Sequence, residues 1–182
     1  ALQRLYTDTS FHKPDFRSAA HTIQQFERPG DIIIVDGPNP DLVFDHYYSG
    51  SSPIFDMRYL HEASDAEIDE ELRRITDGAQ RAWELLYFHP PGPIQVWLAT
   101  RAWAGTPSYH NNIRVTVYGL PGQPMQEKEV NVAFGPELEL LRTGVNSHRL
   151  RPGDLLRVST QWWVHEPAPE YKFSLRLQDA AG

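Results

Sequence analysis

The hydrophobic pattern of this chain changes its period near residue 107, and that change constrains the fold more than any other feature. Before it, segments with apolar residues at helical spacing alternate with short apolar runs such as Ile32 to Val35. After it, apolar and polar residues alternate one by one. The first pattern is typical of strand–helix crossover units, and the second of antiparallel strands with one buried face. The sequence therefore predicts a small, mainly parallel α/β layer over residues 1–106, followed by part of an antiparallel β-sandwich over residues 107–182.

Helices and strands of the first part are predicted from caps and from apolar stripes. Pro14-Asp15 begins a helix, and Ser64 with Glu67 forms a capping box at the start of another. The continuous apolar run at Ile32 to Val35 suits a strand that is buried on both faces. The predicted helices cover residues 15–26, 42–48, 65–79 and 93–104, and the predicted strands cover residues 32–35, 53–57 and 82–88.

Five strands are predicted in the second part, fewer than the seven or so of a free-standing sandwich. They cover residues 113–117, 130–134, 138–140, 154–164 and 171–177. We therefore expect that the sandwich is truncated at its C-terminus, or that the first part or another molecule covers its missing edge.

Charge and composition exclude several classes of function. The chain carries 17 Lys and Arg against 24 Asp and Glu, a net charge of −7, and the excess of acids lies in residues 1–106. Such a chain is a poor counterion for phosphate backbones, so nucleic acid is not an expected partner. It has no cysteine, which excludes disulfides, thiolate zinc sites and a cysteine nucleophile. No apolar run approaches the length of about 20 residues that crosses a bilayer.

Two groups of short motifs occur in a fixed order along the chain. The first group comprises His12 to Ala20, Pro29 to Val35 and Phe44 to Gly50. The second comprises Arg151 to Leu156, Gln161 to Trp163, and Glu170 to Phe173 running on to Asp179. Together they resemble the soluble region that follows the membrane helices in bacterial integral-membrane glycosyltransferases. This class includes the protein mannosyltransferases and the aminoarabinose transferases, which use polyprenyl-phosphate sugars.

The resemblance implies a location and a role. In that family the soluble region lies on the outer face of the cytoplasmic membrane, and the catalytic carboxylates lie in loops between membrane helices. No position of this chain matches those loops, so no catalytic residue is carried over. The resemblance implies a non-catalytic accessory domain whose partners are the membrane-embedded part of the same polypeptide and a glycan or lipid-linked sugar. No cofactor is expected, and a chain that opens at Ala1 without a start methionine is expected to belong to a longer polypeptide.

A ligand site is predicted where the loop after the Ile32 to Val35 strand begins. In open α/β sheets, ligands bind beyond the carboxyl ends of the strands. Planar aromatic rings with polar tips suit a sugar or a lipid phosphate. The alternative is that the aspartate caps a turn and the tyrosines pack on the sheet. The candidate residues are Asp36, Asn39, Asp41, His46, Tyr47 and Tyr48.

Trp163 is the second candidate ligand-binding residue. The alternation places Trp162 on the buried face of its strand and Trp163 on the other face, where its ring could stack on a sugar. Two rival functions follow: a carbohydrate-binding module that uses Trp163 or the Tyr47–Tyr48 loop, and a stand-alone hydrolase in which Asp36 and His46 converge in a pocket. The sequence shows no metal-ligand spacing, nucleophile elbow or nucleotide-binding loop, so no metal is predicted.

Overall fold

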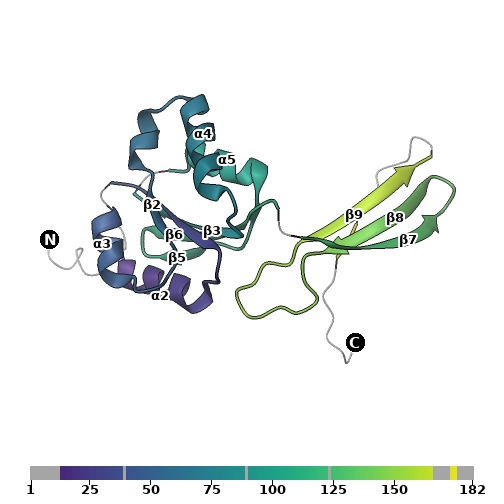
Figure 1. Cartoon of the computed structure of the whole chain (residues 1–182), viewed down its shortest axis with the longest axis horizontal. Helices are drawn as coiled ribbons and strands as arrows, with labels where there is room; N and C mark the ends of the chain where they lie inside the picture. The colour runs from purple at the N-terminus through teal and green to yellow at the C-terminus, as the bar shows by residue number, and fades with distance from the viewer. Residues whose placement is uncertain (1–12, 39, 89, 123, 166–172, 176–182) are drawn as a thin grey trace, which may run out of the picture. The chain divides into compact units, whose positions relative to one another are not determined.

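The computed structural model describes residues 13–38, 40–88, 90–122, 124–165 and 173–175. The chain folds into two compact units. The first comprises Ala1–Pro124 together with Arg149–Arg157, and the second comprises Met125–His148 together with Val158–Gly182. Figure 1 shows the elements of both units. As predicted, an α/β sheet covered by helices is accompanied by a separate antiparallel sheet.

A mixed sheet forms the centre of the first unit. Its order is β2-β1-β3-β6-β4, and β5 also pairs with β6. β1 runs parallel to β2 and β3, whereas β6 runs antiparallel to β3, β4 and β5. The sheet is thus partly rather than mainly parallel. The strands are β1 (Asp31–Asp36), β2 (Ile54–Asp56), β3 (Arg81–Tyr87), β4 (Trp103–Ala104), β5 (Ser108–His110) and β6 (Ile113–Gly119).

β6 does not lie where the sequence pattern placed it. We predicted this strand as the first of the sandwich, in the second part of the chain, but it pairs with β3 from Arg81 opposite Gly119 to Tyr87 opposite Ile113. Its alternating pattern was read correctly as an antiparallel strand. The pattern does not encode which sheet the strand joins, because a mixed sheet accepts an antiparallel strand as readily as a sandwich does. The first unit therefore extends beyond the predicted boundary at residue 106.

Helices cover both faces of this sheet (Figure 1). On one face, α2 and α3 pack on the cluster that contains Ile33, Val35 and Leu85, and on the other, α4 and α5 pack on the cluster that contains Ile34 and Ala82. These apolar faces explain why β1 is apolar at successive positions. The helices are α2 (Phe16–Phe26), α3 (Pro40–Tyr47), α4 (Asp65–Thr76) and α5 (Pro93–Arg101), with a short 3-10 helix, η2 (Arg58–Glu62), before α4.

The predicted caps are present. The Asp15 side chain accepts a hydrogen bond from the backbone N–H of Ser18 at 2.9 Å and begins α2. Ser64 and Glu67 form the predicted capping box of α4. The helix predicted over residues 93–104 ends at Arg101, because Trp103–Ala104 leaves the helix to pair with β6 as β4.

A buried ion pair joins the first residues of β1 and β3. Arg81 donates from Nη2 to Asp31 Oδ2 at 2.6 Å and from Nε to Asp31 Oδ1 at 2.9 Å. Asp31 Oδ2 also accepts from Trp83 Nε1 at 2.8 Å and from the Arg28 backbone N–H at 2.9 Å. The Arg81 side chain is 5% exposed and that of Asp31 is fully buried. Both charges are therefore satisfied by hydrogen bonds inside the unit, as burial requires.

The same ion pair holds the segment Arg149–Arg157 in the first unit. Arg81 Nη1 donates to the carbonyl oxygen of Gly153 at 3.0 Å, and Arg28 pairs with Asp154 at 3.2 Å. Gly153 has a φ of +85°, and a Cβ there would lie 2.4 Å from the Phe26 ring. Only glycine fits this position, because the backbone is left-handed and the ring leaves no room.

The second unit contains a three-stranded antiparallel sheet of order β7-β8-β9. Its strands are β7 (Gln126–Phe134), β8 (Leu138–Val145) and β9 (Val158–Val164). The strand predicted over residues 171–177 falls mostly outside the described residues. Its described part, 173–175, is not in a strand, but the Phe173 ring packs 4.6 Å from that of Trp162. Of this unit's described residues, Leu138 is the one large apolar residue that is buried.

Replacing Arg81 by methionine should destabilise the first unit by about 3–5 kcal/mol, because Asp31 would remain buried without its counterion. Urea unfolding followed by far-UV circular dichroism measures this change. The matched control is Arg73→Met, which removes an exposed ion pair with Asp69 on α4 and should leave the midpoint unchanged. Equal midpoints for the two variants would contradict the structural role of Arg81.

Candidate functional site

Asp36 lies at the carboxyl end of β1, where ligands of α/β sheets usually bind. Its side chain is held from α5: Gln95 Nε2 donates to Asp36 Oδ2 at 2.9 Å and to Glu84 Oε1 at 2.5 Å. Gln95 Oε1 in turn accepts from the Gly92 backbone N–H at 2.5 Å, at the start of the helix. Asp36 is 1% exposed. One amide side chain therefore bridges two buried carboxylates and fixes the start of α5 over the sheet.

Glu84 is the centre of this cluster. It is fully buried in the middle of β3, and Arg114 on β6 donates from Nη2 to its Oε2 at 3.0 Å. Burial raises the pKa of the Glu84 carboxyl above its usual range, although the hydrogen bond from Gln95 and the Arg114 charge oppose that shift. Burial, with the nearby charge of Glu84, also raises the pKa of Tyr118 to about 12.

Sequence reasoning missed Glu84, Gln95 and Arg114. A signal for the first was present, because a lone carboxylate in an otherwise apolar strand needs a buried partner. The partners themselves come from an antiparallel strand and a helix that follow later in the chain. Their approach to Glu84 depends on the sheet order, which the local pattern does not give.

The loop after β1 lies against the C-terminal end of β3. Gly37 has a φ of +148°, and a Cβ on it would lie 2.3 Å from the carbonyl oxygen of Tyr87. Phe88, which follows Tyr87 in the chain, has a φ of +70°, which is rare for a bulky side chain. The loop and the end of the strand thus approach so closely that position 37 has no room for a side chain. Near this loop, the hydrogen bonds of Gln95 and Arg114 to the buried carboxylates connect β1, β3, β6 and α5.

The structure separates the other predicted residues of this loop. Tyr48 is buried: its hydroxyl donates to Glu27 and accepts from the Ser52 backbone N–H at 2.9 Å. Burial, followed by the hydrogen bond to Glu27, raises the pKa of Tyr48. Tyr48 therefore packs on the sheet as a structural residue, which is the alternative to ligand binding that the sequence left open.

His46 and Tyr47 lie on the outer side of α3. Both are exposed, their rings meet edge to face at 4.9 Å, and the Arg17 guanidinium lies 5.4 Å from the centre of the Tyr47 ring. His46 is thus exposed on α3, whereas Asp36 is buried at the end of β1. Asn39 lies outside the described residues, and so does the side chain of Asp41.

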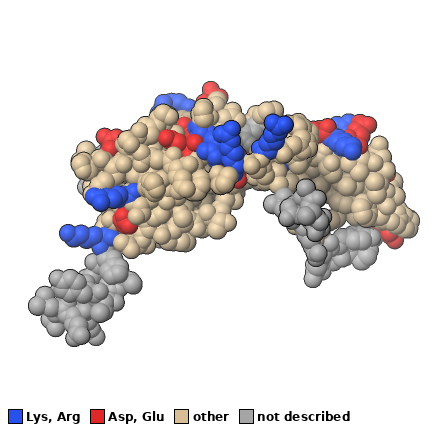
Figure 2. Space-filling view, turned by 90° about the horizontal axis from the view of Figure 1, so that it is seen from below, with Lys and Arg blue, Asp and Glu red and all other residues tan. Residues whose placement is uncertain are grey.

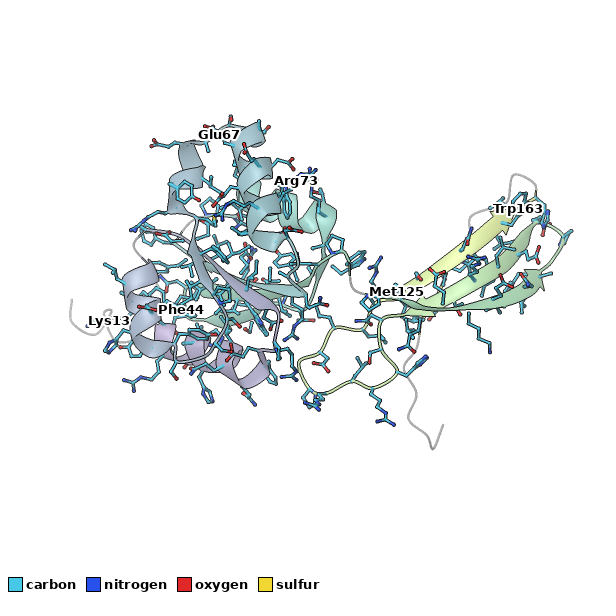
Figure 3. All side chains as sticks on the ribbon, viewed as in Figure 1. Lys13, Phe44, Glu67, Arg73, Met125 and Trp163 are labelled. Atoms are coloured by element: carbon cyan, nitrogen blue, oxygen red, sulfur yellow. The ribbon has the colours of Figure 1, made fainter. Side chains whose placement is uncertain are left out.

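Trp163 is placed on the surface, as the alternation predicted. It is 56% exposed on β9 (Figure 3), opposite Glu139 of β8. The same face carries Arg142, which pairs with Glu129 at 3.1 Å. Trp162 points to the other face, where its ring lies 5.4 Å from that of Phe134. The sheet of the second unit therefore has one polar face that carries an exposed tryptophan and one apolar face.

Each unit contains a hollow that is lined by described residues. On the apolar face of the second unit there is a cavity of about 740 Å³. Its lining residues are Phe134, Leu138, Val158, Thr160, Trp162, Phe173, Ser174 and Leu175. Between η2 and α4 of the first unit lies a hollow of about 460 Å³, and its lining includes four glutamates, Glu62, Glu67, Glu70 and Glu71.

The surface charges do not gather into one basic or acidic face on the side drawn in Figure 2, where acidic and basic side chains are interspersed. In the part of the chain that the structure describes, no group of three or more His, Asp or Glu side chains could hold a metal ion. No helix of the described residues is long and apolar enough to cross a membrane.

Comparison with known proteins gives no relative. No family model, no curated protein and no solved structure matches the chain.

The contribution of Glu84 to folding stability should fall as the pH rises from about 4.5, the ordinary pKa of glutamate, through its raised pKa, whereas His110, whose pKa is lowered by burial, contributes in the opposite direction. Over that range the folded state keeps a proton that the unfolded chain has lost, so rising pH favours unfolding. Urea unfolding at a series of pH values should show this decline in the wild type and a smaller one in Glu84→Gln, which cannot ionise. Thr116→Val, a change opposite Glu84 on β6 that removes no charge, should keep the wild-type slope. Identical slopes for Glu84→Gln and the wild type would refute the assignment.

Proposed function

We propose that this chain is a non-catalytic accessory domain of a membrane glycosyltransferase that uses a polyprenyl-phosphate sugar donor. The domain would lie on the outer face of the cytoplasmic membrane. Its partner is the membrane-embedded part of the same polypeptide. It would hold that part in register or help position the acceptor.

The observation that carries the proposal is the meeting of the two motif groups that resemble this family. Pro29-Gly30-Asp31 belongs to the first group and Arg151-Pro152-Gly153-Asp154 to the second. Arg28 donates from Nη2 to the carbonyl oxygen of Pro152 at 3.2 Å and pairs with Asp154, while Arg81 joins Asp31 to Gly153. Motifs that are about 120 residues apart thus form one structural network, as expected of residues that specify a fold.

The state of the buried carboxylates also supports a non-catalytic role. Asp31 is neutralised by Arg81, Glu84 is paired with Arg114, and Asp36 accepts from Gln95. A general acid or base needs an accessible proton-transfer partner within hydrogen-bond reach. These three carboxylates are at most 2% exposed and bind protein groups, so none of them is placed to exchange a proton with a substrate.

The chain of residues 1–182 should show no sugar transfer and no hydrolysis when it is incubated with a polyprenyl-phosphate sugar, because the proposed catalytic carboxylates belong to membrane loops outside it. The measurement is chromatographic detection of released or transferred sugar. The full polypeptide encoded by the native gene should transfer sugar, and Arg81→Met in it should lower that transfer. Turnover by residues 1–182 alone, or a reading frame without apolar segments of about 20 residues, would refute the proposal.

A second candidate, a carbohydrate-binding surface, is favoured by the exposure of Trp163. The face of an indole ring is electron-rich and attracts the C–H groups of a sugar ring. Glu139 and Gln161 lie beside the ring on the same face of the sheet and could bind sugar hydroxyls. This surface could serve the accessory role as well as a free-standing module.

If the polar face binds glycans, Trp163→Ala should reduce the affinity by at least about tenfold, because loss of a stacking aromatic removes a central contact. Titration calorimetry with oligosaccharides selected on a glycan array measures the affinity. The matched control is Trp103→Ala, since Trp103 is also exposed but its ring is covered by Arg157 at 3.7 Å. Absence of binding by the wild type to any glycan would leave the accessory role standing and dismiss the module.

A further inference from the structure

The free edge of β9 is the least protected strand edge in the second unit. Among the described residues β9 pairs with β8 alone, and no described residue pairs with its other side. Val158–Val164 contains no charge, proline or glycine, and it is rich in β-branched and aromatic residues. Natural proteins usually protect such an edge with charges, proline or a bulge, and an edge without them is a template for another strand.

The opposite edge of the same sheet provides the contrast. β7 carries Glu127, Lys128 and Glu129 in succession, and its register shifts between Glu129 and Val132. These are the devices that discourage strand addition. One edge of the sheet is therefore protected and the other is not, although the two strands are similar in length.

We propose that β9 pairs antiparallel with β9 of a second copy of this chain. A two-fold axis perpendicular to the sheet must pass midway between a residue and its own copy, and the register that pairs all seven residues is centred on Gln161. The absence of charge makes this self-pairing possible, because no like charges meet across the axis. The paired residues are Val158 with Val164, Ser159 with Trp163, Thr160 with Trp162, and Gln161 with its own copy.

Side-chain sizes fit this register. Each tryptophan faces a small hydroxyl residue of the other copy: Trp162 faces Thr160 on the apolar side, and Trp163 faces Ser159 on the polar side. Aromatic and β-branched side chains that face each other stabilise antiparallel pairs. Moving the axis by one residue would place Trp162 opposite itself and would lose pairs at the strand ends. The dimer would join two three-stranded sheets into one of six strands with continuous faces.

The test changes Gln161, because in the proposed register this residue faces its own copy in the other chain. Gln161 is exposed, so Gln161→Glu and Gln161→Lys should each leave the fold intact. Each places like charges directly opposite across the axis and should raise the dimer dissociation constant on the order of tenfold relative to the wild type. An equal mixture of the two variants should restore association as a heterodimer, because opposite charges then face each other. Sedimentation velocity over a concentration series measures the three constants, with far-UV circular dichroism as a check of folding.

Gln126→Glu is the matched control, since it introduces the same change on the protected edge strand β7. It should keep the wild-type dissociation constant. A wild type that stays monomeric at every concentration overturns the proposal. So does a dimer that neither Gln161 variant weakens, a mixture that does not regain association, or a Gln126→Glu variant as weak as Gln161→Glu.

Discussion

The ion pair between Asp31 and Arg81 is the interaction on which the first unit depends. It lies where two parallel strands begin, and it is almost fully buried. A buried charge destabilises a protein unless partners replace its hydration. Here the partners of Arg81 on β3 come from three places: Asp31 on β1, the end of α2 at Phe26 and the returning segment at Gly153. Satisfying one arginine therefore fixes the relation of segments that are far apart in the sequence.

A second buried cluster lies toward the opposite end of the same two strands. Gln95 links Asp36 to Glu84, and Arg114 neutralises Glu84. In many α/β proteins the ligand binds at this carboxyl end of the strands. Here the described side chains at the end of β1 and in β3 bond to a helix and to a neighbouring strand. Buried polar contacts thus hold the parallel strands β1 and β3 at both ends of β1.

Local pattern was sufficient to predict the helices, their caps and most strands, because hydrophobic period and capping residues act within a few neighbours. Local pattern did not predict contacts between segments that are far apart in the sequence. β6 alternates like a sandwich strand yet pairs with β3. Pro152-Gly153-Asp154 was expected to open a long strand but binds Arg28 and Arg81, and β9 begins at Val158. For the candidate site, Trp163 was placed on the correct face, whereas the bridge through Gln95 required knowledge of the sheet order.

The second unit differs from the first in how little it buries. Its described sheet has three strands, and apart from Leu138 its large apolar side chains remain at least partly exposed, including Phe134 and Val164. A sheet of this size needs a well-covered face or additional strands to be stable by itself. The apolar face and the uncharged edge of β9 are the places where such partners can bind, whereas the charged edge of β7 resists them. The low burial of apolar side chains among the described residues of this unit is thus also what makes it suited to association.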